Sequence, residues 1–324
     1  MNMKKIIMGL LVLVLALAFI GCGVRGPGQT KQEGNNGQQT AQKSGKKISK
    51  VGFTVMTMNN PFFVKMRDVA RQELEKNGIS MVEADPQFDP GKQLSAVEDF
   101  VNQGVGAIFL DPVDANAIVP AIKKANQAGI PVFTLDGNAA GGDIVSFVGT
   151  DNVQAGRIVG EYLAKRLNGK GKIAVIDYPL VTSCLERVQG LKEALANYPD
   201  IKIIAEQKGG TVTDALKVAE TWMNQYKDLD AIFAINDPNA LGALTAIENA
   251  KRQDHIFVVG IDGAKEAYDA MSQGRNFGAT AAQFPDKMAI KTVDNLLKWA
   301  KGEQVEKETK IPTELITKDN IPKS

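Results

Sequence analysis

Residues 107–112 read Ala-Ile-Phe-Leu-Asp-Pro, and residues 231–238 read Ala-Ile-Phe-Ala-Ile-Asn-Asp-Pro. Each apolar run is followed by a helical stretch and then by a second apolar run that ends in Asp-Gly, at Asp136-Gly137 in the first case and at Asp262-Gly263 in the second. A strand, a helix and a second strand form a βαβ unit, whose strands are parallel. The sequence therefore predicts one unit used twice, although two unrelated βαβ units can also be alike by chance.

The same alternation of short apolar runs and amphipathic stretches extends over most of the chain. It predicts parallel sheets covered by helices on both faces, which is an α/β fold. Ten strands over roughly 270 residues fit two doubly wound sheets better than one. The predicted strands are Val51–Met56, Ser80–Ala84, Ala107–Leu110, Val132–Leu135, Ile144–Val148, Ile173–Asp177, Ile201–Glu206, Ala231–Ile235, Phe257–Ile261 and Phe277–Ala281. The predicted helices include Phe63–Asn77, Gln93–Gln103, Val153–Leu167 and Ala215–Tyr226.

Four polar side chains stand where predicted strands end, namely those of Asp111, Asp136, Asn236 and Asp262. In open parallel sheets, ligands bind beyond the carboxyl ends of the strands. Two lobes that face each other would bring these groups to one cleft.

The composition excludes several classes of function. The chain has 324 residues, 44% of them hydrophobic, and a formal net charge of +1. No basic field is present to bind nucleic acid. One histidine and two cysteines exclude most metal sites and disulfide frameworks, so we expect no metal and no cofactor.

The N-terminal segment is typical of an exported protein. Lys4 and Lys5 precede an apolar run, 6–20, that is too short for a membrane-spanning helix of about 20 residues. Residues 1–21 are therefore predicted to be a signal peptide. The run ends before Gly21-Cys22, which resembles a bacterial lipobox, so Cys22 is the expected lipid attachment site, with ordinary secretion as the alternative. Residues 22–47 are polar and are predicted to form a lipid anchor and a flexible tether.

Motifs of common enzymes are absent from the sequence. No Gly-x-Gly-x-x-Gly follows the first strand, and no Gly-x-Ser-x-Gly is present. Cys184 and His255 are the one possible thiol–imidazole pair of the mature chain, and they fall at opposite ends of predicted strands. A glycosidase that uses Asp136 and Asp262 as paired carboxyls stays an alternative. The sequence otherwise favours a protein that is not an enzyme.

A further set of motifs resembles the ribose-binding group of type I periplasmic sugar-binding proteins. The resemblance covers residues 48 to 320, in order and with matching spacing. The matching motifs are Val55-Met56-Thr57-Met58-Asn59-Asn60-Pro61-Phe62-Phe63, Pro131-Val132-Phe133-Thr134-Leu135-Asp136, Gly149-Thr150-Asp151-Asn152, Ile235-Asn236-Asp237, Ala240-Leu241-Gly242-Ala243, Gly260-Ile261-Asp262-Gly263 and Ala282-Gln283-Phe284-Pro285-Asp286.

The resemblance implies a set of ligand-binding residues. Ionised acceptors and a guanidinium make strong hydrogen bonds to sugar hydroxyls, and aromatic rings cover the apolar face of a sugar. The polar contacts it implies are Asn60, Asp136, Arg187, Asn236, Asp262 and Gln283, and the aromatic ones are Phe62 and Phe63. Asp111, a carboxylate where ribose binders tend to carry asparagine, is expected as an additional acceptor.

Three departures from the ribose-binding pattern bear on the ligand. Gly137 stands where arginine is frequent, Gly209-Gly210 replaces a region that carries an aromatic, and Ile261 replaces another aromatic. We interpret these changes as enlarging the pocket, so that a hexose or a polyol is favoured over ribose. Tyr178 is a candidate for a replacement stacking face.

The resemblance also implies the organisation and the role of the whole chain. Lobe one comprises residues 48–150 and 284–312, and lobe two comprises residues 151–283 and 313–324, joined by a hinge of three crossings. The expected function is that of a monomeric solute-binding lipoprotein outside the cell membrane, which captures a monosaccharide and delivers it to the permease of an ABC importer. The alternative is a receptor that presents a sugar or autoinducer-type signal to a sensor kinase or chemoreceptor.

Overall fold

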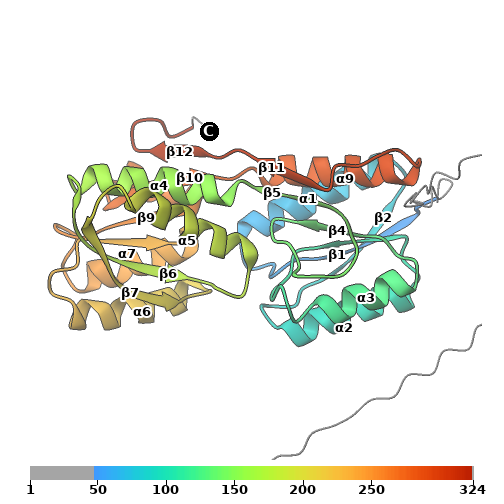
Figure 1. Cartoon of the computed structure of the whole chain (residues 1–324), viewed down its shortest axis with the longest axis horizontal. Coiled ribbons are helices and arrows are strands. Elements are labelled where there is room, and N and C mark those ends of the chain that lie inside the picture. The colour runs from blue at the N-terminus through green and yellow to red at the C-terminus, as the bar shows by residue number, and fades with distance from the viewer. Residues whose placement is uncertain (1–46, 323–324) are drawn as a thin grey trace, which may run out of the picture. The chain divides into compact units, whose positions relative to one another are not determined.

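The computed structural model describes residues 47–322, so the predicted signal peptide and lipid attachment site lie outside the described residues. Two six-stranded sheets with helices on both faces make up this part of the chain (Figure 1). The predicted α/β fold with two lobes is confirmed. All ten predicted strands are present, with end points that shift by at most a few residues.

The sheet of lobe one has the strand order β11-β5-β4-β3-β1-β2. Its strands are β1 (Lys50–Thr54), β2 (Ser80–Ala84), β3 (Ala107–Leu110), β4 (Val132–Leu135), β5 (Ile144–Thr150) and β11 (Glu308–Ile311). All of its pairings are parallel. Helices α1 (Pro61–Lys76) and α9 (Pro285–Ala300) cover one face, and α2 (Pro90–Asn102) and α3 (Val119–Gln127) cover the other (Figure 1).

The sheet of lobe two repeats this plan with the order β12-β10-β9-β8-β6-β7. Its strands are β6 (Lys170–Asp177), β7 (Asp200–Lys208), β8 (Ala231–Ala234), β9 (Phe257–Asp262), β10 (Phe277–Ala282) and β12 (Glu314–Thr317). Its helices are α4 (Asn152–Arg166), α5 (Thr182–Leu195), α6 (Val212–Gln225), α7 (Asp237–Asn249) and α8 (Lys265–Ser272). Only the last strand, β12, pairs antiparallel, with β10.

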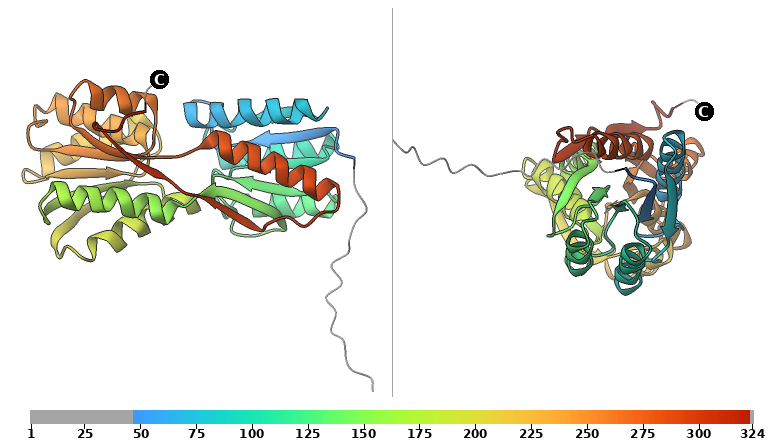
Figure 2. Two further views of the ribbon diagram at one scale, coloured as in Figure 1. Left: turned by 90° about the horizontal axis from the view of Figure 1, so that it is seen from above. Right: turned by 90° about the vertical axis from the view of Figure 1, so that its right-hand side faces the viewer.

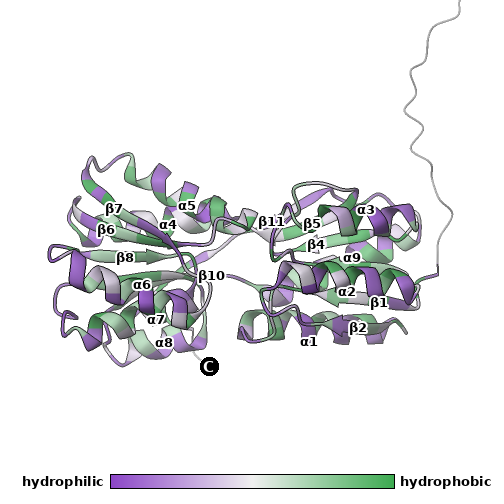
Figure 3. Ribbon diagram, turned by 90° about the horizontal axis from the view of Figure 1, so that it is seen from below, coloured by the Kyte–Doolittle hydropathy of each residue, from purple (hydrophilic) through white to green (hydrophobic). Residues whose placement is uncertain are grey.

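The inner strands are largely apolar along their length because both of their faces are buried. In β6, Ile173 and Val175 enter one hydrophobic cluster, whereas Ala174 and Ile176 enter another on the opposite face. A strand between two helical layers must be apolar at every position, unlike the alternating strands of a solvated sheet. Figure 3 accordingly shows largely green central strands and helices that carry both green and purple.

The chain changes sheet at three places, after β5, after β10 and after β11. The segments lie beside one another: the backbone N–H of Asp151 donates to the carbonyl of Ile311 at 2.9 Å, and that of Thr313 donates to the side chain of Gln154 at 3.0 Å. Figure 2 shows the orange and dark red segments passing between the sheets. The residue boundaries of the lobes stay a prediction.

Strands β11 and β12 were not predicted from the sequence. Each has four residues with polar and apolar positions mixed, Glu-Thr-Lys-Ile and Glu-Leu-Ile-Thr, and each lies at the edge of its sheet. Edge strands need not be apolar on both faces, so they lack the run that marks the inner strands.

Candidate functional site

A pocket lies where the two sheets meet, with lining residues contributed by both lobes. The volume open to the centre of a water molecule is about 40 Å³, and it is about 460 Å³ when all space between the lining atoms and the open mouth is counted. The lining residues are Met56, Asn60, Phe62, Phe63, Phe88, Asp136, Tyr178, Ser183, Cys184, Arg187, Gly210, Ile235, Asn236, Asp262 and Gln283. The structure thus brings together eight of the nine residues that the sequence analysis proposed for ligand binding. The ninth residue, Asp111, is not part of the pocket lining.

Two helices begin at the pocket, each with an asparagine at its N-cap followed closely by proline. Asn60 Oδ1 accepts a hydrogen bond from the backbone N–H of Phe62 at 3.0 Å, which caps α1. Asn236 Oδ1 accepts from the backbone N–H of Asn239 at 3.0 Å, which caps α7. Each oxygen thus already accepts a hydrogen bond from its helix, and the amide NH₂ of each asparagine can donate to a ligand.

The two aspartates of the pocket adopt uncommon backbone conformations. Asp136 at the end of β4 has φ 63°, and Asp262 at the end of β9 has φ 150°. Positive φ is uncommon for a residue with a side chain and is found where the surrounding structure enforces it, often at functional sites. Both side chains are almost buried, with exposed fractions of 4% and 8%.

A second aspartate lies behind each of these two. Asp111 and Asp237 follow the neighbouring strands β3 and β8, and both are fully buried. Asp111 Oδ1 accepts from the backbone N–H of Gly137 at 3.0 Å, and Asp237 Oδ2 accepts from the backbone N–H of Ala264 at 2.8 Å. The repeat seen in the sequence therefore extends to the side chains: each lobe has a front carboxyl in the pocket and a rear carboxyl behind it.

Asp111 holds this rear position and is not part of the pocket lining. Its side chain is enclosed between β3 and the turn at Gly137, because its oxygen fixes the backbone of that turn. Its role as an acceptor for the ligand therefore stays a prediction, without support from its position.

The front and rear carboxyls all have raised pKa values. Burial is the largest cause in each case, because removing water disfavours the charged form. The pKa of Asp237 is raised to about 7. Asp136 further raises the pKa of Asp111, and Asp237 further raises that of Asp262.

Arg187 is the cation that opposes these charges. It projects from α5 and is 4% exposed. Its Nε donates to Asn152 Oδ1 at 2.7 Å, its Nη1 donates to the carbonyl of Ile235 at 2.8 Å, and Nη1 lies 3.9 Å from Asp262 Oδ1. These partners fix the guanidinium in place before any ligand arrives.

A chain of hydrogen bonds joins this arginine to two of the crossings between the sheets. Asn152 Nδ2 donates to the carbonyl of Thr150 at 3.1 Å, and the Thr150 hydroxyl donates to Gln283 Oε1 at 2.6 Å. Gln283 Nε2 then donates to Asp262 Oδ1 at 2.7 Å. Together with the ion pair of Arg187 and Asp262, these contacts close a ring that includes three residues of the pocket, Arg187, Asp262 and Gln283.

Two glycines allow the helix of Arg187 to approach its neighbour closely. A Cβ atom on Gly156 of α4 would lie 1.9 Å from the carbonyl oxygen of Arg187, and one on Gly190 of α5 would lie 2.0 Å from that of Val153. Such contacts are impossible, so only glycine fits at either position. The tight helix pair places Arg187 against Asn152.

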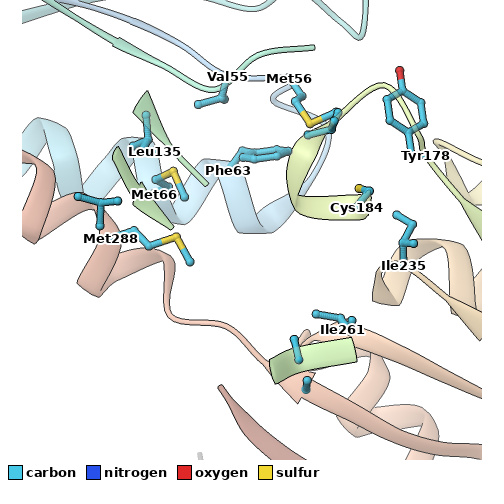
Figure 4. Close-up of a cluster of buried hydrophobic side chains, with 14 of the residues drawn as sticks. Val55, Met56, Phe63, Met66, Leu135, Tyr178, Cys184, Ile235, Ile261 and Met288 are labelled. Atoms are coloured by element: carbon cyan, nitrogen blue, oxygen red, sulfur yellow. The ribbon is translucent and has the colours of Figure 1, made fainter. Parts of the chain in front are cut away.

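Aromatic and sulfur-containing side chains form the apolar wall of the pocket. The rings of Phe62 and Phe63 meet edge to face with centroids 5.2 Å apart, and those of Phe88 and Tyr178 are 6.3 Å apart. Figure 4 shows Phe63 and Met56 near Tyr178, Cys184 and Ile235 from lobe two. Phe62 is partly exposed, whereas Phe63 is 5% exposed and enters the core.

Six lining residues were not proposed from the sequence. They are Met56, Phe88, Ser183, Cys184, Gly210 and Ile235. Phe88 lies in the loop between β2 and α2 at φ 61°, and the direction of a loop side chain depends on such backbone angles. An aromatic residue shortly after a strand end is the one signal that could have identified it.

The three departures from the ribose-binding pattern fall in different places. A Cβ atom on Gly137 would lie 2.5 Å from Asp111 Oδ1, so the space beside this glycine is already filled. Ile261 is fully buried in the core. Only Gly210 lines the pocket, and a Cβ atom there would lie 3.3 Å from the ring of Tyr178. Tyr178, the proposed stacking face, is itself a lining residue.

A second hollow lies beside the pocket on lobe two, between α5 and β7. It shares Tyr178 and Cys184 with the pocket, and its remaining lining comes from lobe two alone. It lacks the polar groups that converge from both lobes on the first pocket, which is why we assign the site to the latter.

Chemistry by a thiol or a metal has no support in the described part of the chain. Burial raises the pKa of Cys184 to about 12, which keeps the thiol protonated, and His255 is exposed and outside the pocket lining. Between residues 47 and 322 no cluster of three or more His, Cys, Asp or Glu side chains could hold a metal ion. Within the same range no helix is long and apolar enough to cross a membrane.

Comparison with known proteins identifies the family. The model of the periplasmic binding protein domain matches residues 51–304. The ribose import binding protein RbsB of Salmonella typhimurium is 36% identical over 83% of this chain and 90% of its own length.

Two solved structures share the fold. The crystal structure of a galactofuranose binding protein is 33% identical, with a TM-score of 0.79 over 84% of this chain and 95% of that one. The fructose-binding periplasmic domain of a hybrid two-component system is 26% identical, with a TM-score of 0.80 over 84% and 92%. The chain therefore belongs to the periplasmic binding protein family, as a type I sugar-binding protein of the group that includes the ribose-binding proteins.

Proposed function

We propose that this protein is the solute-binding component of an ABC importer, which captures a monosaccharide in the pocket between the lobes and delivers it to a membrane permease. The observation that carries the proposal is the pocket itself. Acceptors from both lobes, a fixed guanidinium and aromatic rings converge there in a member of a sugar-binding family. Carboxylates and guanidinium groups match sugar hydroxyls, and aromatic faces match the C–H surface of the ring.

The proposed ligand is a six-carbon sugar or a polyol in preference to ribose. Gly210 carries no side chain at the pocket wall, and Tyr178 offers an aromatic face beside it. The similar proteins carry names that include ribose, galactofuranose and fructose, so the family accepts both pentoses and hexoses. Calorimetric titration of ribose beside glucose, galactose, fructose, allose and myo-inositol tests this choice, and tightest binding of ribose would refute it.

Capture is proposed to occur by closure of the lobes about the three crossings. On the cleft, the backbone N–H of Asn138 in lobe one donates to the Thr182 hydroxyl of lobe two at 3.1 Å, and Ala115 N–H donates to the carbonyl of Leu180 at 3.1 Å. These contacts would hold the lobes together over a bound ligand. Small-angle scattering should give a smaller radius of gyration with ligand, and identical curves at saturation would contradict closure.

The protein is further proposed to act as a monomer, outside the cell membrane, held there by a lipid on Cys22. The lipid attachment rests on the sequence alone, because Cys22 lies outside the described residues. Size-exclusion chromatography with light scattering, applied to the chain without its leader, should return the mass of one chain.

The decisive experiment is a thermal-shift screen against pentoses, hexoses, polyols and inositols. A ligand at about 100 times its dissociation constant adds about 2.7 kcal/mol to the free energy of unfolding, which raises the melting temperature clearly. The variant Asp262→Asn should reduce this shift, whereas Asp228→Asn on the surface should not. If no sugar stabilises the parent protein, the proposed function is wrong.

A receptor role is the second candidate, favoured by the similarity to the periplasmic domain of a two-component system. Both roles use the same pocket, so binding data do not separate them. Uptake of labelled ligand does: deletion of the gene should abolish uptake by an importer, whereas uptake should persist if the protein serves only a sensor kinase.

A further inference from the structure

The acidic and basic side chains that line the pocket are unequally divided between the lobes. Of the fifteen lining residues, Asp136 and Asp262 are acidic and Arg187 is basic. Arg187 belongs to lobe two, where Asp262 lies 3.9 Å from its Nη1 and where Asn152 and Ile235 bind the same guanidinium. The lobe-one side of the lining has one carboxyl and no cation.

One side-chain oxygen of Asp136, the lobe-one carboxyl, lacks a hydrogen-bond partner in the described part of the chain. Asp136 is 4% exposed, and the oxygen without a partner within residues 47–322 is Oδ1. Behind it lies Asp111, whose Oδ2 is likewise unpaired within the same range. Burial raises the pKa of both groups, and Arg187 is the one charge that acts to lower that of Asp136. A buried carboxyl oxygen without a hydrogen-bond donor is costly, so this half of the pocket suits a ligand that brings a donor. A positively charged donor would in addition favour the ionised form of Asp136 against its burial.

The described part of the chain does not provide that donor. Lys208 Nζ lies 4.7 Å from the centre of the ring of Tyr178, a lining residue, but Lys208 is not itself among the lining residues. A metal ion is not suited either, because no cluster of three or more potential ligands occurs between residues 47 and 322. The remaining source is the bound molecule.

We propose that the ligand is an amino sugar or an amino polyol whose ammonium group binds Asp136. The inference rests on the proposed sugar-binding function and narrows its ligand class. An ammonium group has three donors, and hydrogen bonds between ionised partners are the stronger ones. The hydroxyls of the same ligand remain for Asp262, Arg187 and Gln283 on the opposite side, and the partly exposed ring of Phe62 covers its apolar face.

Calorimetry with matched ligand pairs tests the inference. Glucosamine is compared with glucose, galactosamine with galactose, and each amine with its N-acetyl derivative, at neutral pH and constant ionic strength. The amine should bind at least about tenfold more tightly than its hydroxyl counterpart. Acetylation removes the charge and should remove the advantage.

Two isosteric variants locate the effect. Asp136→Asn keeps the shape of the side chain and should abolish the preference for the amine. Asp262→Asn, on the other lobe, should weaken amine and neutral sugar by the same factor. A preference that persists in Asp136→Asn would show that Asp136 is not the binding group.

The outcomes also separate this inference from the function on which it rests. If neutral sugars bind as tightly as their amines, the amine proposal is overturned while the sugar-binding function stands. If neither kind of sugar binds, the proposed function itself fails, and the amine proposal falls with it.

Discussion

The hydroxyl of Thr150 donates a hydrogen bond of 2.6 Å to Oε1 of Gln283, and the two residues lie at two different crossings between the sheets. Gln283 in turn binds Asp262, a front carboxyl of the pocket, at 2.7 Å. The geometry of the crossings and the position of a proposed ligand-binding side chain are therefore set by the same pair of contacts.

Replacing this threonine should weaken ligand binding. Thr150→Val keeps the shape of the side chain but leaves Gln283 Oε1 buried without a donor, which costs about 1–3 kcal/mol. Titration calorimetry and chemical unfolding measure the loss. Thr313→Val at the third crossing is the matched control, because its hydroxyl contact of 3.4 Å is weak and its backbone bond is kept. Equal effects of the two substitutions would contradict a specific role for the Thr150 contact.

The close approach of α4 and α5 should not tolerate a methyl group. Gly156→Ala would place a Cβ atom 1.9 Å from the carbonyl oxygen of Arg187 and force the helices apart. We expect destabilisation by about 1–3 kcal/mol together with weaker ligand binding, since Arg187 moves with its helix. In the control Gly160→Ala, also on α4, the nearest atom is a methyl carbon at 3.0 Å. If Gly156→Ala binds ligand as tightly as the parent, the packing of these helices does not position the arginine.

The rear carboxyl of lobe two should make stability depend on pH. The pKa of Asp237 is raised from 3.8 to about 7, so between these values the folded chain keeps a proton that the unfolded chain has released. The free energy of unfolding should therefore fall as the pH rises through this window, by at most about 1.4 kcal/mol per pH unit for one proton.

Asp237→Asn tests this dependence, because asparagine does not titrate. Unfolding by urea at several pH values between about 4 and about 7 should give a flatter profile for the variant than for the parent. Asp228→Asn serves as the control, since the Lys172 side chain lowers the pKa of this exposed carboxyl. A parent profile that rises with pH over the window would show the assigned direction to be wrong.

Arg187 should be needed for both binding and stability. Arg187→Ala removes the cation beside the buried Asp262 and leaves the carbonyl of Ile235 without its donor. We expect affinity for the ligand to fall at least about tenfold, and the melting temperature without ligand to fall as well. Arg187→Lys should recover part of the stability but not the affinity, because a lysine cannot reproduce the planar fork. A variant that binds like the parent would remove Arg187 from the site.

The lipid anchor predicted from the sequence can be tested in the cell. Cys22→Ser removes the thiol that would be acylated. Labelled palmitate should enter the parent and not the variant, and the variant should appear in the culture medium. Equal labelling of the two proteins would show that Cys22 is not the attachment site, and Cys184→Ser controls for labelling at the other cysteine.

Burial on both faces explains why the fold could be predicted so fully. Phe109 of β3 and Val175 of β6 lie in runs that are apolar at every position, and such runs are visible in a sequence. The edge strands β11 and β12 were not predicted, because each has only four residues with mixed polar and apolar positions, a pattern that resembles a polar loop.

Most residues of the candidate site could also be predicted from the sequence, but the sequence did not show which of them line the pocket and which lie behind it. Asp136 and Asp262 end strands, so their place at the cleft followed from topology. Asp111 also follows a strand, but its side chain lies behind the pocket lining. There its Oδ1 accepts a hydrogen bond from the backbone N–H of Gly137, a contact that the sequence pattern does not reveal. Phe88 was not predicted as a lining residue, because the position of its ring depends on a positive φ in a loop, which the sequence does not show.

The interleaved course of the chain has a consequence for its synthesis. Helix α9 packs on β4 and β5, and β11 pairs with β5, yet both are made only after β6 to β10 have emerged. The first sheet thus lacks its outer strand and one of its covering helices until residues 285–311 have left the ribosome. Domains usually fold as units and from the N-terminus, but here each sheet needs a strand that is made after segments of the other lobe. Neither lobe can therefore complete its sheet before parts of the other lobe have been synthesised.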